Sequence, residues 1–176
     1  MTTNKQVEGA ATTPVPPALD LNKDFTGLVK FSAPTDDEMQ TLAGLRSSSG
    51  PWKDRGESTT ESMEALTKLR PFISVGKVDT VVVGYVTVER DGPVPGASYM
   101  RNIVVKSELR KKGVGKQLLE QSLKVARDMN RKTLALRVDP ANSSAVSFYR
   151  ANGFTTVATV VSKKSGKLRL LMSREL

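Results

Sequence analysis

The chain of 176 residues contains no cysteine and no histidine. Without cysteine it can form no disulfide, no thiolate metal site and no cysteine-linked acyl intermediate. Without histidine it lacks the commonest general base and the commonest metal ligand, so acid–base chemistry has to use carboxylates, tyrosine, backbone groups or water. We therefore expect no metal cofactor.

Long apolar runs are also missing, and none of the sequence is apolar enough over a sufficient length to span a bilayer. The first residues lack the basic and apolar regions of a signal peptide, so we expect a cytoplasmic protein. A chain of 176 residues supports one domain with a sizeable core.

The net charge of +9 is concentrated in one segment. Between Arg101 and Arg137 the sequence has eleven basic residues against three acidic residues, and the rest of the chain is close to neutral. This distribution favours the attraction of a phosphorylated ligand to one site, although a solvated basic helix face would have the same composition. A nucleic-acid surface is the weakest interpretation, because only 5% of the residues are aromatic and base stacking needs aromatic side chains.

A glycine-containing turn lies inside this basic segment. It reads Arg110-Lys111-Lys112-Gly113-Val114-Gly115 and follows a predicted strand over residues 99–105. After it, apolar residues recur at helical spacing and predict an amphipathic helix: Leu118, Leu119, Leu123, Ala126 and Met129. Glycines at the start of a helix let a ligand approach the free amide groups of the first turn, so the pattern predicts a phosphate site. An ordinary turn before a solvated helix is the alternative.

A second pattern follows a predicted strand over residues 133–138. It consists of Asn142, Ala145, Phe148, Tyr149, Gly153 and Phe154. The two patterns, in this order, resemble the GNAT superfamily of acyl-CoA-dependent N-acyltransferases, most strongly over residues 99–154 and more weakly from about residue 28 to the C-terminus. The resemblance implies an α+β fold, with a mixed, mostly antiparallel sheet of about seven strands and helices on both faces. Two of its strands splay apart to hold the coenzyme.

The remaining organisation fits one such domain. Residues 1–25 are rich in proline, alanine and threonine and predict an extended arm, and residues 26–176 form the acetyltransferase-like domain. The other predicted elements are a strand over 28–32, a helix over 34–45, a long loop over 46–60, a helix over 61–69, a hairpin of 72–78 with 81–90, and a hairpin of 155–161 with 168–172.

The resemblance also implies where acetyl-CoA binds. Backbone groups of Ile103, Val104 and Val105 would pair with the pantetheine arm and the acyl carbonyl, although Ile103 and Val105 are equally expected as core residues. The pyrophosphate would be held by the amides of Lys111, Lys112, Gly113, Val114, Gly115 and Lys116. Arg110 would brace the turn or meet a phosphate. Asn142 would hydrogen-bond the coenzyme arm or cap the helix that begins near Ser143.

The implied chemistry is direct attack of a primary amine on the thioester of acetyl-CoA in a ternary complex. Tyr149 matches the tyrosine that often protonates the leaving thiolate in this family, and the alternative is a buried aromatic beside Phe148 and Phe154. Many relatives carry a glutamate early in the strand that begins here with Ser98 and Tyr99, and this chain has none there. Glu89 is the best remaining carboxylate for the base. It could equally be a surface residue, with water relayed to backbone carbonyls in its place.

Two further function classes stay open beside an N-acetyltransferase for a small amine or a protein amino group. One is a structural or assembly protein, possibly virion-associated, whose N-terminal arm docks on a protein partner, and the other is the basic nucleic-acid module. The loop at 53–57 and the hairpin turn at 163–167 have a basic balance. Since like charges repel, we expect an acceptor that is neutral or carries an anionic group.

Overall fold

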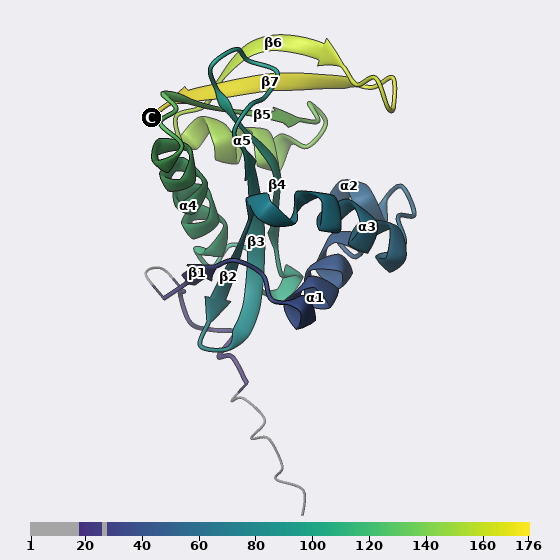
Figure 1. The fold of residues 1–176 in the computed structure, drawn as a ribbon, viewed down its shortest axis with the longest axis vertical. Coiled ribbons are helices and arrows are strands. Elements are labelled where there is room, and N and C mark those ends of the chain that lie inside the picture. The colour runs from purple at the N-terminus through teal and green to yellow at the C-terminus, as the bar shows by residue number, and fades with distance from the viewer. Residues whose placement is uncertain (1–17, 26–27) are drawn as a thin grey trace, which may run out of the picture.

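The computed structural model describes residues 18–25 and 28–176 and shows a seven-stranded sheet in the order β1-β2-β3-β4-β5-β7-β6 (Figure 1). All neighbouring strands are antiparallel except β4 and β5, which confirms the predicted mixed sheet. The elements are β1 (Lys30–Ser32), α1 (Asp36–Ser47), α2 (Gly50–Lys53), α3 (Thr59–Leu69), β2 (Ile73–Val78), β3 (Val81–Glu89), β4 (Ser98–Val105), α4 (Val114–Asp128), β5 (Thr133–Val138), α5 (Ser143–Ala151), β6 (Thr155–Val161) and β7 (Leu168–Glu175). None of the helices in the described residues is long and apolar enough to cross a membrane.

Capping side chains fix where the first helices begin. Thr35 and Glu38 form a capping box at α1, and Ser58 and Glu61 form another at α3, so α3 starts two residues before the predicted position. The predicted long loop between them contains the short helix α2, with Pro51 in its first turn.

Helices cover both faces of the sheet, as expected (Figure 1). Helices α4 and α5 pack on one face, where Leu118, Leu123 and Tyr149 join the main core. On the other face, α1 and α3 cover a second core around Val75 and Tyr85. Met129, predicted as part of the buried stripe of α4, is instead the residue that ends this helix.

The predicted N-terminal arm is only partly within the described residues, because positions 1–17 lie outside them. Phe25, its last residue, is 1% exposed and belongs to the main core, and Leu19 packs against that core. The packed domain therefore includes Phe25. The Phe25 amide also donates a hydrogen bond of 3.1 Å to the Lys112 carbonyl, which ties this segment to the glycine-containing turn.

Both predicted hairpins are present. Asp79 has a φ of 52° in the tight turn between β2 and β3, a conformation that aspartate tolerates better than most residues. Strand β7 continues three residues beyond the predicted end at 172, because it pairs with the whole of β5 as far as Thr133↔Glu175.

Strands β4 and β5 separate along their length, as the resemblance implies. They pair only at Ser98↔Leu134, Tyr99↔Ala135 and Met100↔Leu136. The register of β3 against β4 shifts at the same level, where Arg101 is an extra residue in β4, and such a bulge bends a strand. We call the facing edges of residues 101–105 and 137–138 the strand opening.

Candidate functional site

The β4 side of the strand opening contains the three predicted coenzyme-pairing residues. Val104 is 3% exposed and packs in the core under α1 and α3, while Ile103 and Val105 pack against the core under α4. Their side chains therefore have the expected core role. The same residues have no β5 partner, so the backbone groups on that edge are open to an added strand-like ligand.

The glycine-containing turn leads into α4 with two residues in the left-handed region. Lys111 has a φ of 60° and Gly113, which precedes α4, has a φ of 87°. Gly113 provides no capping side chain, and among the described residues none accepts a backbone hydrogen bond of good geometry from the amides of Val114, Gly115 and Lys116. These three amides are the groups that an anion at a helix N-terminus would use.

Gly115 faces the space between β4 and α5. A Cβ atom built on Gly115 would lie 3.7 Å from Val105 Cγ2 and 3.9 Å from Phe148 Cζ, which is ordinary van der Waals contact. The fold can therefore accept a small side chain here. A large side chain would extend into the region where backbone from the strand opening and the start of α4 come together.

The basic side chains of the turn form no salt bridge in the part of the chain that the structure describes, and Arg110 interacts with Glu108 only electrostatically. Arg110, Lys111 and Lys116 are exposed, and within the described part of the chain none of them makes an ion pair. The Arg110 guanidinium makes no hydrogen bond to the turn among the described residues, so the bracing interpretation has no support. Their positive charge is available to a polyanion.

Asn142 caps α5. Its Oδ1 accepts a hydrogen bond of 3.1 Å from the Ala145 amide, so the capping interpretation is confirmed. The side-chain nitrogen of Asn142 has no hydrogen-bond partner in the described residues. A hydrogen bond from that nitrogen to the coenzyme stays a prediction.

Tyr149 lies on α5 in a shell of aromatic rings. It is 7% exposed, and its ring packs edge-on against Phe148 and Phe154 at centroid distances of 5.5 and 5.8 Å. Burial raises the pKa of the Tyr149 phenol, and the nearby Tyr99 raises it further. Because its pKa is raised, the phenol keeps its proton at neutral pH, and no hydrogen bond to a described residue occupies it, so it is available as a donor.

Glu89 lies at the end of β3, directly across from Tyr99 on β4. Its carboxylate accepts a hydrogen bond of 2.5 Å from Arg101 Nε, and the Arg101 guanidinium lies 5.4 Å from the centre of the Tyr99 ring. The hydrogen bond to Glu89 is the main cause that raises the pKa of Arg101. Glu89 is thus held beside the β4 bulge, but it would have to exchange its arginine partner before it could take a proton.

A buried polar cluster, which the sequence analysis did not identify, supports the helices over the second core. Arg46 Nε donates to Glu57 at 2.6 Å, and their side chains are only 10% and 14% exposed. Arg46 also contacts Asn102 on β4 at 3.4 Å and lies over the Trp52 ring, while Ser62 donates to Glu57 at 2.7 Å. Arg46 continues the helical spacing of the buried residues Met39, Leu42 and Ala43. This spacing is the feature of the sequence that could have indicated a buried arginine.

We expect Glu57→Gln to lower the free energy of unfolding by about 2 kcal/mol at pH 7, because Arg46 would keep its charge in a poorly solvated place without a carboxylate. Burial alone would raise the pKa of Glu57, but hydrogen bonds from Arg46 and Ser62 outweigh it and the pKa is lowered. The stability that the Glu57 carboxylate contributes is therefore present at pH values above its pKa in the unfolded state. It is lost as the pH falls through the lower pKa of the folded state. Urea unfolding at pH 7 and pH 3 measures both effects.

Exposed Glu64 on α3 provides the matched control, because Glu64→Gln removes the same charge from a side chain that has no ion-pair partner among the described residues. Equal unfolding midpoints for Glu57→Gln and Glu64→Gln at pH 7 would contradict the prediction.

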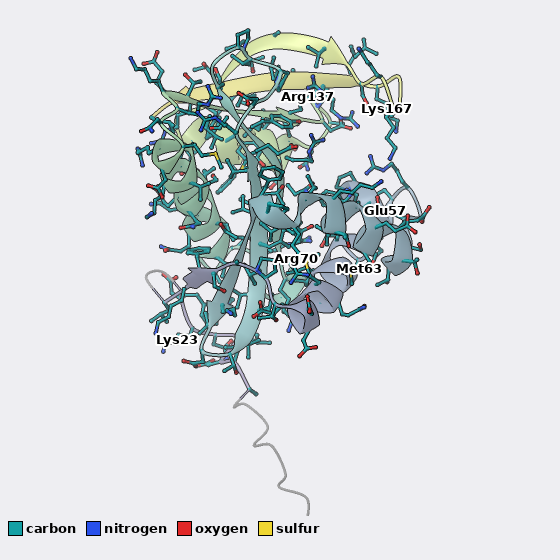
Figure 2. The ribbon with its side chains drawn as sticks, viewed as in Figure 1. Lys23, Glu57, Met63, Arg70, Arg137 and Lys167 are labelled. Atoms are coloured by element: carbon teal, nitrogen blue, oxygen red, sulfur yellow. The ribbon has the colours of Figure 1, made fainter. Side chains whose placement is uncertain are left out.

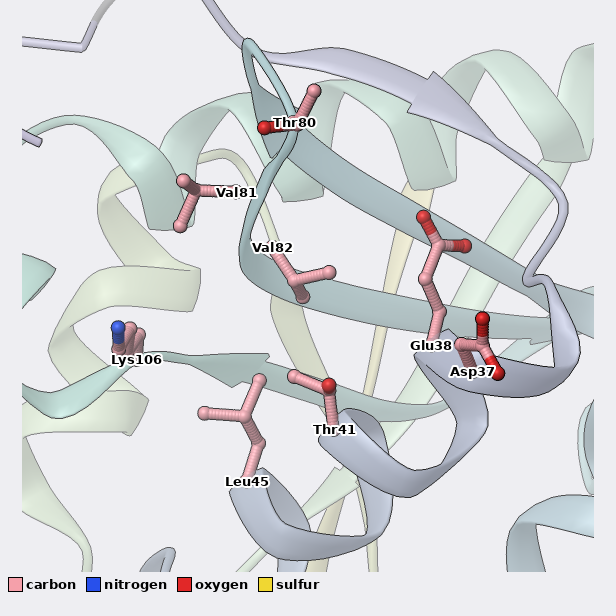
Figure 3. A pocket seen from close by; sticks show the side chains of 8 residues that line it. All are labelled: Asp37, Glu38, Thr41, Leu45, Thr80, Val81, Val82 and Lys106. Carbon is pink, nitrogen blue, oxygen red and sulfur yellow. The ribbon is translucent and has the colours of Figure 1, made fainter. Parts of the chain in front are cut away.

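A cavity of about 340 Å³ lies elsewhere, between α1 and the turn of the β2–β3 hairpin (Figure 3). Asp37 and Glu38 line it, and Glu38 is already paired with Lys77 at 2.7 Å while its carboxylate caps α1. Lys106 also lines the cavity, so its charges are mixed, and none of the predicted coenzyme-binding residues is part of its lining. The described residues contain no cluster of three acidic side chains that could hold a metal ion.

Solved structures share this fold at low sequence identity. Ard1 from Thermoplasma volcanium aligns with a TM-score of 0.68 and 20% identity over 85% of this chain and 98% of its own. The ribosomal-protein-S18-alanine N-acetyltransferase from Escherichia coli aligns with a TM-score of 0.64 and 15% identity, over 84% of this chain and 93% of its own. PaiA N-acetyltransferase from Thermoplasma acidophilum was solved in complex with coenzyme A. It aligns with a TM-score of 0.62 and 15% identity, over 84% of this chain and 99% of its own.

The family assignment comes from the sequence itself. The residues that match include β4, the glycine-containing turn and α5, which are the elements that form the strand opening and its surroundings. The model of the Acetyltransferase (GNAT) family matches residues 38–154, more than half of the chain, and the chain belongs to this family.

Proposed function

We propose that this acetyltransferase transfers an acetyl group from acetyl-CoA to a primary amine by direct attack in a ternary complex. The observation that carries the proposal is the strand opening beside the first turn of α4, where unpaired backbone edges and unpaired helix amides occur together. The first can hold an extended amide-bearing arm and the second a pyrophosphate. The alternative of an assembly protein without catalysis receives no support from the family match.

The described residues fit acetyl-CoA in their charge and in their unpaired backbone groups. The amides of Lys111 to Lys116 and the free charges of Arg110, Lys111 and Lys116 would hold the phosphates. The backbone of Ile103, Val104 and Val105 would pair with the pantetheine arm, and the Asn142 side-chain nitrogen would donate to it. One solved structure that shares this fold contains coenzyme A, which supports acetyl-CoA as the acetyl donor.

Acetyl-CoA supplies the reactive thioester when it is bound. Tyr149 acts as the general acid, because its buried phenol remains protonated at neutral pH and can donate to the thiolate as the carbon–sulfur bond breaks. The amine, with an ordinary pKa of about 10.4, must lose a proton before attack. Glu89 takes that proton directly or through water once Arg101 releases it, and backbone carbonyls with water are the alternative acceptor.

Two measurements on the same preparation test the proposal. Acetyl-CoA should bind with micromolar affinity and raise the melting temperature, since a ligand at one hundred times its Kd stabilises the folded state by about 2.7 kcal/mol. A thiol-release assay with acetyl-CoA against a panel of primary amines should then detect acetylation. A folded protein that neither shifts with acetyl-CoA nor releases thiol with any amine would contradict the proposal.

A further inference from the structure

An arginine whose side chain has no ion-pair or hydrogen-bond partner among the described residues lies on β5 beside the strand opening. Leu134, Leu136 and Val138 of β5 are buried in the core under α4, so by strand alternation Ala135 and Arg137 lie on the opposite face. Ala135 packs there against Tyr99. Arg137 directly follows Leu136, the last β5 residue that pairs with β4.

Arg137 is exposed, and no described residue forms an ion pair or a hydrogen bond with its side chain. Its neighbours on adjoining strands differ in this respect. Arg101 is paired with Glu89 at 2.5 Å and Arg169 with Asp139 at 3.0 Å, so the nearby carboxylates are already neutralised. Arg137 therefore contributes an uncompensated positive charge to this face of the sheet.

The charge of Arg137 acts on Tyr99, which packs on the same face of the sheet. Burial raises the pKa of Tyr99, and Arg137 is the first of the positive charges that oppose this rise. Tyr99 in turn acts electrostatically on the phenol of Tyr149, the proposed acid. Tyr99 is thus coupled electrostatically to both Arg137 and Tyr149.

Arg137 lies opposite Leu171 of β7, in the strand next to the β6–β7 hairpin. Figure 2 shows Arg137 under the β6–β7 hairpin, with Lys167 at the far end of that hairpin and Glu57 in the region of α2 and α3 below it. Lys164, in the same hairpin turn, interacts electrostatically with Glu61 of α3.

We infer that Arg137 binds a carboxylate of the acceptor, so that the acceptor is a small, amino-acid-like molecule with a primary amine and a carboxylate. The inference rests on the proposed function and deepens it. A planar guanidinium binds a carboxylate through two parallel hydrogen bonds, which fixes the orientation of the molecule as well as its charge. An acceptor held in this way at Arg137 would present its amine toward the strand opening.

The test uses acceptors in matched pairs, each an α-amino acid and its α-amide, in the thiol-release assay. Arg137→Gln should lower kcat/KM for the acids between about tenfold and about a hundredfold, the range for a hydrogen bond to a charged group, and leave the amides unchanged. Arg137→Lys should recover only part of the loss, because lysine keeps the charge without the planar fork. Arg127→Gln, an exposed arginine near the end of α4, removes the same charge and should leave both classes unchanged.

The outcomes separate the inference from the proposed function. If the wild-type enzyme acetylates the amides as well as the acids, or if Arg137→Gln lowers both classes equally, Arg137 does not bind a carboxylate and the inference is wrong. If no amine of either class is acetylated and acetyl-CoA produces no thermal shift, the proposed function fails and the inference fails with it.

Discussion

Replacing Tyr149 with phenylalanine is expected to lower turnover by about a hundredfold or more. The aromatic ring would keep its edge-on contacts with Phe148 and Phe154, so the core should remain packed. What is lost is the proton donor for the leaving thiolate. Because the change acts in the transition state, kcat and kcat/KM should fall together while the Kd for acetyl-CoA stays nearly constant.

Tyr85→Phe is the matched control for this experiment. Tyr85 is fully buried, but it belongs to the second core under α1 and α3, where its hydroxyl interacts electrostatically with Arg46. Its loss should leave turnover unchanged. A normal rate in Tyr149→Phe, or an equal loss in both variants, would return Tyr149 to a purely structural role.

The pH profile gives a second readout for Tyr149. A phenol donates a proton only below its pKa, and burial raises the pKa of Tyr149 above its ordinary value. Between pH 7 and about pH 10, the wild-type rate should therefore not fall through deprotonation of the general acid. A decline centred near pH 8 in kcat would indicate that another group is the acid.

Much of the fold could be predicted from sequence because its signals are local. The apolar spacing of Leu118, Leu119 and Leu123 predicts the buried face of α4, and the glycines before it predict where the helix begins. The hairpins are marked by turn residues such as Asp79. The glycine-containing turn is one of these local features, whereas the coenzyme roles of residues 103–105 and Asn142 are implied only by the resemblance to the GNAT superfamily.

The acceptor side could not be predicted in the same way, because it depends on contacts between distant segments. The β4 bulge at Arg101 follows from pairing with β3, and the sequence around it contains no glycine or other marker. The ion pair of Arg46 and Glu57 joins two sides of a loop that was predicted to lack structure. That Arg137 has no ion-pair partner among the described residues can be recognised only from the structure, in which Glu89 is paired with Arg101 and Asp139 with Arg169.

Replacing Gly115 with leucine is expected to weaken acetyl-CoA binding more than a hundredfold while the protein remains folded. The structure has room for a Cβ at this position, 3.7 Å from Val105 and 3.9 Å from Phe148, and non-glycine residues favour helix formation. The rest of a leucine side chain would occupy space beside the strand opening. It would block the close approach of the coenzyme to the first amides of α4.

Three glycine variants make this prediction specific. Gly44 lies on α1 with open space around it, so Gly44→Leu should leave the acetyl-CoA-induced thermal shift intact. Gly113 has a φ of 87°, so Gly113→Ala should lower the melting temperature even without ligand, because a side chain is strained in the left-handed region. Of the three, only Gly115→Leu should melt at the parent's temperature without ligand and lose the acetyl-CoA-induced thermal shift. If acetyl-CoA shifts Gly115→Leu as much as the parent, the start of α4 does not hold the coenzyme, and the proposed pyrophosphate site has to be abandoned.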